Sequence, residues 1–298
     1  MPFVMAVLSS MLYGVADFLG GMGSRRAPAV TVTAWFQVTG LVLLVLYACL
    51  APGVTRASDL AWAAVSGASG GIGVLLLYRA LAGGTVSTAA PLVSMIALTV
   101  PVVVGLASGE RPGVLPLSGI GLGVVAVALI SAHGAALEPA TAPGGAAAGV
   151  PASSSARGAG ASRAAALVPA VASGVLIGLF LVCLGRVQPG ASGWPLVAGR
   201  ASASVCLFAM LIASRSAFKL APAARPPMIG AAMTDVSANV LYLLAVQRAP
   251  LSLVATLVSL APATTVLLAQ VVLRERLGPA QRVGVVVALA AVVLLAQG

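Results

Sequence analysis

Three ionisable residues lie deep inside apolar stretches of the 298-residue sequence: Asp17, Arg200 and Asp235. A charged side chain in apolar surroundings is costly unless it has a partner of opposite charge, contact with water or a neutral form. Ionisable residues in such places therefore point to ligand binding, to proton exchange or to a buried ion pair.

Further polar residues recur at helical spacing around these positions. In the stretch TDVSANVLYL, Asp235, Asn239 and Tyr242 are separated by four and three residues, so they share one face of an α-helix. Two other sets also share a helical face: Ser10, Tyr13 and Asp17 in one stretch, and Arg200 and Ser204 in another. Three helices can therefore present hydrogen-bonding groups to one cavity.

Two interpretations of these residues stay open. In the first, Arg200 binds a substrate carboxylate or pairs with Asp235, while Asp17 or Asp235 exchanges a coupling proton, because desolvation favours the neutral form of a carboxyl group. In the second, Arg200 and Asp235 form an ion pair that only fixes the register of two helices. The candidates for substrate binding or coupling are Asp235, Asn239, Arg200, Asp17, Tyr242 and Tyr13.

The composition indicates which elements carry these residues. Of all residues, 60% are hydrophobic and 7% are charged, against roughly 25% charged in typical soluble domains. We count ten apolar stretches of about 18 residues or more, the length that crosses a hydrocarbon core. They cover residues 3–22, 31–51, 60–82, 85–108, 113–133, 164–184, 194–214, 226–247, 251–273 and 279–297. We therefore predict an all-α integral membrane protein with ten transmembrane helices.

The formal net charge of +10 would suggest nucleic-acid binding in a soluble protein. Here the basic residues stand mostly singly at the ends of apolar stretches, where they can reach anionic lipid headgroups. We therefore expect the lipid bilayer as a partner and no nucleic acid.

The sequence offers little material for a metal, cofactor or catalytic site. Cys49, Cys183 and Cys206 fall in apolar stretches without metal-ligand spacing, and His133 is the single histidine. The nucleotide-binding pattern GxxxxGK[ST] does not occur. We predict no metal, no cofactor and no enzymatic activity, since a membrane enzyme would need clustered catalytic groups at a membrane face.

A tract rich in Gly, Ala, Pro and Ser divides the chain in the middle. Residues 134–163 have no apolar periodicity and are predicted to form a flexible linker. The linker separates a first unit of five helices, residues 1–133, from a second unit of five, residues 164–298.

The two units resemble each other. Tyr78 matches Tyr242 at an offset of 164, and Glu110 matches Glu275 at an offset of 165. Because each unit has an odd number of helices, the second must enter the bilayer from the opposite side. This predicts inverted repeats, an architecture suited to alternating access around a site at the midplane.

Prolines and glycines recur inside the predicted helices. Pro91 and Pro101 in the fourth stretch and Pro262 in the ninth remove helix hydrogen bonds, so they should bend these helices and are candidate hinges, or else static packing features. Pairs of glycines four residues apart should let backbones approach closely. These pairs are Gly67 and Gly71, Gly119 and Gly123, and Gly174 and Gly178.

With the stretches YGVADFLGG, APLVSM, GERP and DVSANVLYLLAVQRAPLSLVATLVSLAPATTVLLAQVVLRERL, the chain resembles the EamA family of the drug/metabolite transporter superfamily. The resemblance covers nearly everything except the linker. It implies a secondary transporter with ten helices and a central cavity, often an exporter of amino acids, other metabolites or drugs.

We therefore expect a multi-pass protein of the inner (cytoplasmic) membrane that moves a small organic solute, functions as a monomer and is coupled to protons; an uncoupled facilitator or channel is the alternative. Ten basic residues fall on one side of the predicted topology and four on the other. The positive-inside rule then puts both termini outside the cytoplasm, whereas the family resemblance implies termini inside.

Overall fold

The computed structural model describes residues 1–24, 26–82, 86–131, 159–213, 218–273 and 278–297. The helices are α1 (Pro2–Ser24), α2 (Ala29–Leu50), α3 (Ala57–Ala82), α4 (Val86–Ala107), α5 (Val114–Ser131), α6 (Ala159–Gly185), α7 (Trp194–Ala213), η2 (Pro222–Ala224), α8 (Arg225–Val246), α9 (Leu251–Val258), α10 (Ala261–Val272) and α11 (Pro279–Leu295). Apart from an isolated bridge between Val54 and Ala191, these residues contain no strand. The predicted all-helical class is confirmed.

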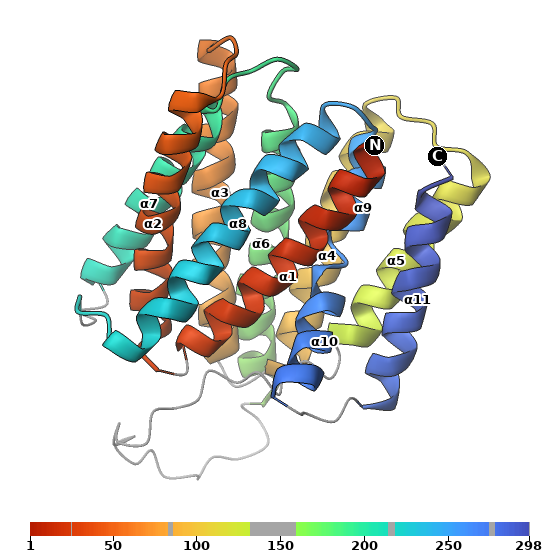
Figure 1. Ribbon diagram of the computed structural model, residues 1–298. Helices are drawn as coiled ribbons and strands as arrows, with labels where there is room; N and C mark the ends of the chain where they lie inside the picture. The colour runs from red at the N-terminus through yellow and green to blue at the C-terminus, as the bar shows by residue number, and fades with distance from the viewer. Residues whose placement is uncertain (25, 83–85, 132–158, 214–217, 274–277, 298) are drawn as a thin grey trace.

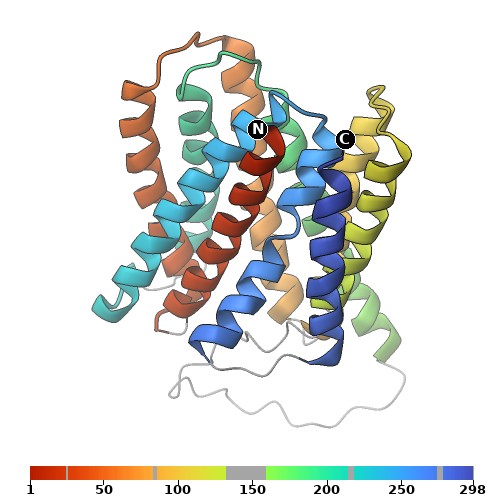
Figure 2. The same cartoon turned by 45° about the vertical axis from the view of Figure 1, so that its right-hand side comes forward.

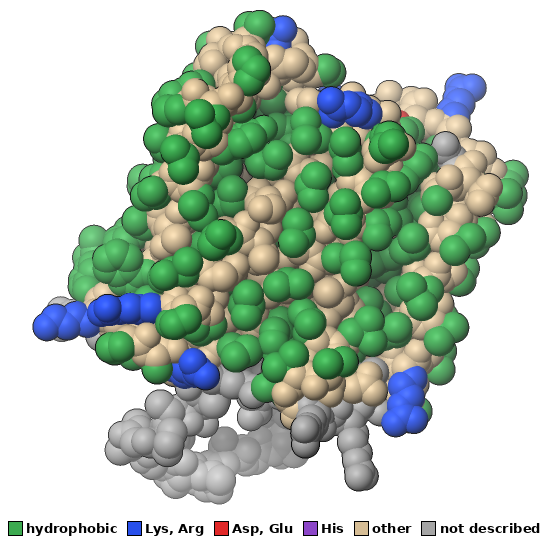
Figure 3. Space-filling view, viewed as in Figure 1, with side chains coloured by type: hydrophobic (Ala, Val, Ile, Leu, Met, Phe, Trp, Pro, Cys, Tyr) green, Lys and Arg blue, Asp and Glu red, His purple; other side chains and the backbone are tan. Residues whose placement is uncertain are grey.

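The outside of the helix bundle is apolar. Six of the described helical spans are long and apolar enough to cross a membrane, and three further apolar helices are shorter. Large hydrophobic side chains cover the middle of the visible surface, while lysines and arginines lie toward its two ends (Figure 3). A surface of this kind is suited to a hydrocarbon environment, because it needs no water to hydrate it.

The helices form two layers with a pair of helices at each edge. In the views of Figures 1 and 2, α8, α1 and α10 lie in front of α3, α6 and α4, with α2 and α7 at one edge and α5 and α11 at the other. The packing agrees: α1 contacts α8, α9 and α10, while α3 contacts α6 and α7. Among the described residues, α1 makes no extensive contact with α3, α4 or α6.

Both chain termini lie at the same end of the molecule, which we call the terminal face (Figure 1). Helix α5 ends and helix α6 begins at the other end, which we call the opposite face. Helix α1 therefore runs from the terminal face to the opposite face, and α6 runs the other way.

The glycine pairs pack as predicted. A Cβ on Gly67 would overlap the carbonyl oxygen of Gly199 in α7. A Cβ on Gly119 would lie 2.9 Å from Leu295 of α11, and a Cβ on Gly174 would lie 2.7 Å from Ile96 of α4. The missing side chains thus permit close backbone approach between helices, where lipid supplies no hydrophobic drive.

The ninth predicted stretch is one apolar span, Leu251–Val272, long enough to cross a membrane, and its helix is interrupted next to the proline that was predicted to bend it. Helix α9 ends at Val258, α10 begins at Ala261, and Pro262 occupies the first turn of α10. Proline has no N–H, so the Val258 carbonyl loses the helical donor four residues ahead. In contrast, α4 continues through Pro101. The side chain of Pro91 lies outside the described residues.

The second unit also begins earlier than predicted. Helix α6 starts at Ala159, so the last five residues assigned to the linker belong to a helix. Alanine is the best helix former, and the alanines around position 161 extend the apolar helix toward its N-terminus. The rest of the predicted linker lies outside the described residues.

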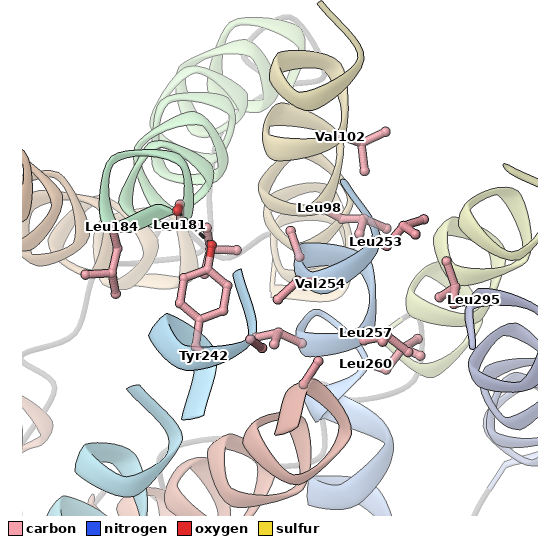
Figure 4. Close-up of a cluster of buried hydrophobic side chains, with 14 of the residues drawn as sticks. Leu98, Val102, Leu181, Leu184, Tyr242, Leu253, Val254, Leu257, Leu260 and Leu295 are labelled. Carbon is pink, nitrogen blue, oxygen red and sulfur yellow. Dashed lines mark hydrogen bonds between the residues drawn. The ribbon is translucent and has the colours of Figure 1, made fainter. Parts of the chain in front are cut away.

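A hydrophobic cluster fills the molecule near the terminal face, where α4, α6, α8 and α9 meet (Figure 4). Helix α9 is buried on every side, as expected for a helix inside the bundle. Its residues from Ser252 to Val258 are all at most 5% exposed. This cluster closes the terminal face of the bundle.

Candidate functional site

The site is built around a contact between two charged side chains of α7 and α8, helices that both pack against α2. The guanidinium of Arg200 in α7 donates a hydrogen bond to the Oδ2 atom of Asp235 in α8 and forms an ion pair with it. The other terminal nitrogen of Arg200 donates to the Oε1 atom of Gln37 in α2. The side chains of Arg200 and Asp235 are 9% and 14% exposed. Three helices thus meet at one buried charge pair.

Helix orientation explains why this pair can exist in an apolar bundle. On α8, Met233 is 54% exposed and belongs to the outer surface, whereas Asp235 lies roughly 160° round the helix from Met233 at 3.6 residues per turn. On α7, Val205 and Ile212 are exposed, and Arg200 lies on the other side. Both charged residues therefore face protein, as the helical spacing predicted.

Two residues of α2 complete the surroundings of the guanidinium. The ring of Phe36 lies under Arg200, with 5.1 Å between the ring centroid and the guanidinium carbon, a cation–π geometry. A Cβ on Gly40 would lie 2.7 Å from an Arg200 nitrogen, so a larger residue there would require the guanidinium to shift. The sequence analysis missed Gln37, Phe36 and Gly40. The signal was a glutamine in the middle of the apolar stretch 31–51.

Asn239 supports the carboxylate from its own helix. Its side-chain amide donates to the Asp235 Oδ2 atom at 3.0 Å and to the Asp235 backbone carbonyl at 2.8 Å. The Oδ2 atom thus accepts from both Arg200 and Asn239. The predicted stripe of Asp235 and Asn239 is a hydrogen-bonded unit aimed at α7.

Asp17 and Tyr13 approach this unit from α1. The outer surface of α1 is formed by Val4, Leu8 and Met11, which are 45–58% exposed. Asp17 lies roughly 150° away from them, yet its side chain is also exposed. On this side, α1 has no extensive contact with α3, α4 or α6 among the described residues, which agrees with the exposure of Asp17.

We call the region between Tyr13, Asp17, Arg200 and Asp235 the central crevice. Tyr13 lies within electrostatic range of the other three, and Asp17 lies within range of Asp235. The Tyr13 hydroxyl is buried and has no hydrogen-bond partner among the described residues. The structure thus brings together four of the predicted site residues from three helices.

Exposure on the inner side of α1 is greater toward the opposite face. On the inner side of α1, Ala6 and Ser10 near the terminal face are buried, and Asp17, closer to the other end, is exposed. A Cβ on Gly20 or Gly21 would meet no atom within 4 Å. The exposure of the inner side of α1 therefore increases from the terminal face toward the opposite face.

Tyr242, a further predicted site residue, lies within electrostatic range of Tyr13 but belongs to the buried core. It is fully buried in the hydrophobic cluster, and its hydroxyl donates to the Leu181 carbonyl of α6 at 2.7 Å (Figure 4). This contact joins α8 to α6, so we leave Tyr242 out of the site.

Glu110 has an unexpected partner. Its carboxylate accepts hydrogen bonds from the backbone N–H groups of Leu251 at 2.6 Å and Ser252 at 2.9 Å. These are the first two residues of α9, whose free N–H groups and dipole favour a carboxylate. Glu110 thus connects the first unit to the second. Glu275 lies outside the described residues.

Among the described residues, no three His, Cys, Asp or Glu side chains lie close enough together to hold a metal ion. What the crevice offers chemically is one neutralised ion pair, one further carboxyl group and one unpartnered hydroxyl group.

Comparisons with known proteins agree with this architecture. One solved crystal structure of another protein is similar over 98% of this chain and 95% of its own, with a TM-score of 0.73 and 14% identity. That likeness concerns the fold alone. A search of curated proteins found no match. The model of the EamA-like transporter family matches residues 1–132 and 154–297, and the chain therefore belongs to this family of multi-pass membrane transporters.

Proposed function

We propose that the protein is a secondary transporter that moves a small organic solute across the cytoplasmic membrane by alternating access, as a monomer, in the direction of export and in exchange for protons. The observation that carries the proposal is the central crevice. It joins a buried ion pair and an exposed carboxyl group inside an apolar bundle, where charged groups mark substrate or ion pathways.

The arrangement of the two units supports alternating access. Helices α1 and α6 begin equivalent units and run in opposite directions (Figure 1), as inverted repeats do. In this conformation the hydrophobic cluster closes the terminal face, and the crevice is accessible from the opposite face. Inverted repeats can exchange these two arrangements.

The interruption between α9 and α10 gives this exchange a candidate hinge. Discontinuous helices in transporters lie next to the transported solute and absorb changes of backbone angle. Pro262 frees a carbonyl at this point, and Thr265 one turn later donates to the Gly14 carbonyl of α1 at 3.0 Å. A change of backbone angle at the interruption would therefore also move α1, the helix that carries Asp17.

Basic residues support the direction of export. Most of them lie on the side of the opposite face in the sequence topology, which the positive-inside rule assigns to the cytoplasm. The crevice is then open to the cytoplasm, ready to load a solute for export. Labelling of single cysteines at each face in intact cells would test this orientation.

Flux measurements in proteoliposomes test the function. The purified protein is reconstituted with a pH-sensitive dye inside, and a panel of amino acids, nucleosides and organic amines is tested for counterflow. We expect flux of one solute class with proton movement in the opposite direction. Flux without proton movement and without response to a pH gradient would favour the uncoupled facilitator.

Variants connect the flux to the crevice. We expect Arg200→Ala and Asp235→Asn each to lower flux at least about tenfold in protein that still inserts into the membrane. Ser237→Ala is a matched control, because Ser237 stands two residues from Asp235 on the exposed side of α8. Wild-type flux in either site variant would show that the crevice is not the transport site.

A further inference from the structure

The charges of the central crevice do not balance. Arg200 is neutralised by Asp235, with which it forms an ion pair. Asp17 adds a second carboxyl group within electrostatic range of Asp235. No ion pair or hydrogen bond links the Asp17 side chain to another described residue. The crevice therefore carries a net charge of about −1 when both carboxyl groups are ionised.

The crevice also contains acceptor oxygens that no donor in the described part of the chain satisfies. Two of the five N–H groups of Arg200 donate to Gln37 and Asp235, and the Asn239 amide donates to Asp235. The hydrogen bonds to the Asp235 carboxylate all reach Oδ2 among the described residues, which leaves its Oδ1 atom as an acceptor.

The unused groups on α1 are oxygens as well. The Asp17 carboxylate accepts only when it is ionised, and the Tyr13 hydroxyl can accept while it donates. Tyr13 and Asp17 are four residues apart on α1, so they are neighbours on one helix face. The Tyr13 hydroxyl is buried without a partner, and a buried polar group in that state is costly until a ligand or water satisfies it.

We propose that the transported solute is an organic cation with a protonated amine, which the Asp17 carboxylate and the Tyr13 hydroxyl bind in the central crevice. An ammonium group supplies the positive charge that balances the Asp17 carboxylate, and N–H donors for that carboxylate and for the Tyr13 oxygen. The same carboxyl group then holds in turn the proton of the proposed coupling and the ammonium group of the solute. This inference rests on the proposed transport function.

The charges of the crevice also disfavour a solute that is recognised only by its carboxylate. Such a solute would have to displace Asp235 from Arg200. Displacement would leave the Asp235 carboxylate buried without its counter-ion beside Asp17, and an unpaired buried charge is strongly destabilising. The structure thus moves substrate recognition from Arg200, where the sequence suggested a carboxylate contact, to Asp17.

The test is equilibrium binding to the detergent-purified full chain, by titration calorimetry, with probes of one shape and different charge. Phenethylamine is cationic at neutral pH, 3-phenylpropionate is anionic and 2-phenylethanol is neutral; tetraethylammonium has a charge but no N–H donor. We expect phenethylamine to bind at least about tenfold more tightly than the anion and the alcohol. Tetraethylammonium should bind more weakly than phenethylamine.

Variants identify the groups responsible. Asp17→Asn should weaken phenethylamine binding at least about tenfold, Tyr13→Phe about threefold, and Asp17→Glu less than Asp17→Asn. Glu110→Gln is the control for loss of a carboxyl group elsewhere, because Glu110 caps α9, and it should bind as the wild type does. The thermal midpoint of each variant establishes that it is folded.

The outcomes separate the two proposals. Equal or tighter binding of the anion or the alcohol, or unchanged phenethylamine binding in folded Asp17→Asn, overturns the cation assignment. Flux of another solute class in proteoliposomes, without binding of phenethylamine or tetraethylammonium, overturns the cation assignment too. It leaves the transporter proposal intact. Absence of both binding and flux overturns the transporter proposal itself.

Discussion

Gly14 of α1 packs directly against Thr264 of α10. A Cβ at position 14 would lie 2.5 Å from the Thr264 Cβ and 2.6 Å from the Ala261 carbonyl oxygen. Gly178 of α6 makes the corresponding contact with Val100 of α4, where the distance would be 2.6 Å. Both pairs are related by an offset of 164 residues. The first helix of each unit thus packs against the helix carrying the prolines in the other unit.

Gly14→Ala should therefore destabilise the protein. The new methyl group would force α1 away from α10, and overpacking of this kind costs about 1–3 kcal/mol. Gly20→Ala on the same helix is the matched control, since its Cβ meets no atom within 4 Å and alanine favours helix. We expect a lower thermal midpoint in detergent for Gly14→Ala and an equal or higher one for Gly20→Ala. Equal midpoints for both variants would contradict the close contact.

The contact between Glu110 and α9 predicts a second effect on stability. Glu110→Ala should remove a cap shared between the two units, at a cost of about 0.5–2 kcal/mol. Glu110→Gln should cost less, because its amide oxygen still accepts one hydrogen bond. Both are measured as thermal midpoints, with Arg111→Ala as the control for the exposed neighbour. A Glu110→Ala midpoint no lower than that of Arg111→Ala would argue against the cap.

The sequence predicted the elements of the site better than their partners. Apolar length and helical spacing located the helices within a few residues and put Asp235 and Asn239 on an inward face. The same spacing put Asp17 on the inner side of α1. These features depend on one helix at a time, so periodicity alone reveals them.

Contacts between helices were harder to predict. Gln37 binds Arg200, and Glu110 binds the start of α9, because helices far apart in sequence meet at particular heights. Periodicity carries no information about relative height. The split of the ninth helix was anticipated only as a bend at Pro262, since Pro101 in the corresponding helix leaves α4 continuous.

A variant of Tyr242 can distinguish the predicted role of this residue in binding from a role in packing. Tyr242→Phe removes the hydroxyl that donates to the Leu181 carbonyl and should lower stability by about 0.5–1.5 kcal/mol. Solute affinity should stay unchanged, because the residue is fully buried and its hydroxyl is already bonded to α6. The Kd for the transported solute and the thermal midpoint are measured on the same preparation. A change in Kd with an unchanged midpoint would return Tyr242 to the site.

The pair of Arg200 and Asp235 can be tested as a unit by a double-mutant cycle. Arg200→Met or Asp235→Leu alone leaves a buried charge without its partner, which costs about 3–5 kcal/mol. The double variant contains no such charge, so we expect its thermal midpoint to exceed that of either single variant. Flux should remain lost in the double variant if the pair serves transport and return if it only fixes helix register. Additive losses of stability in the double variant would show that the two side chains do not depend on each other. That outcome would contradict the ion pair.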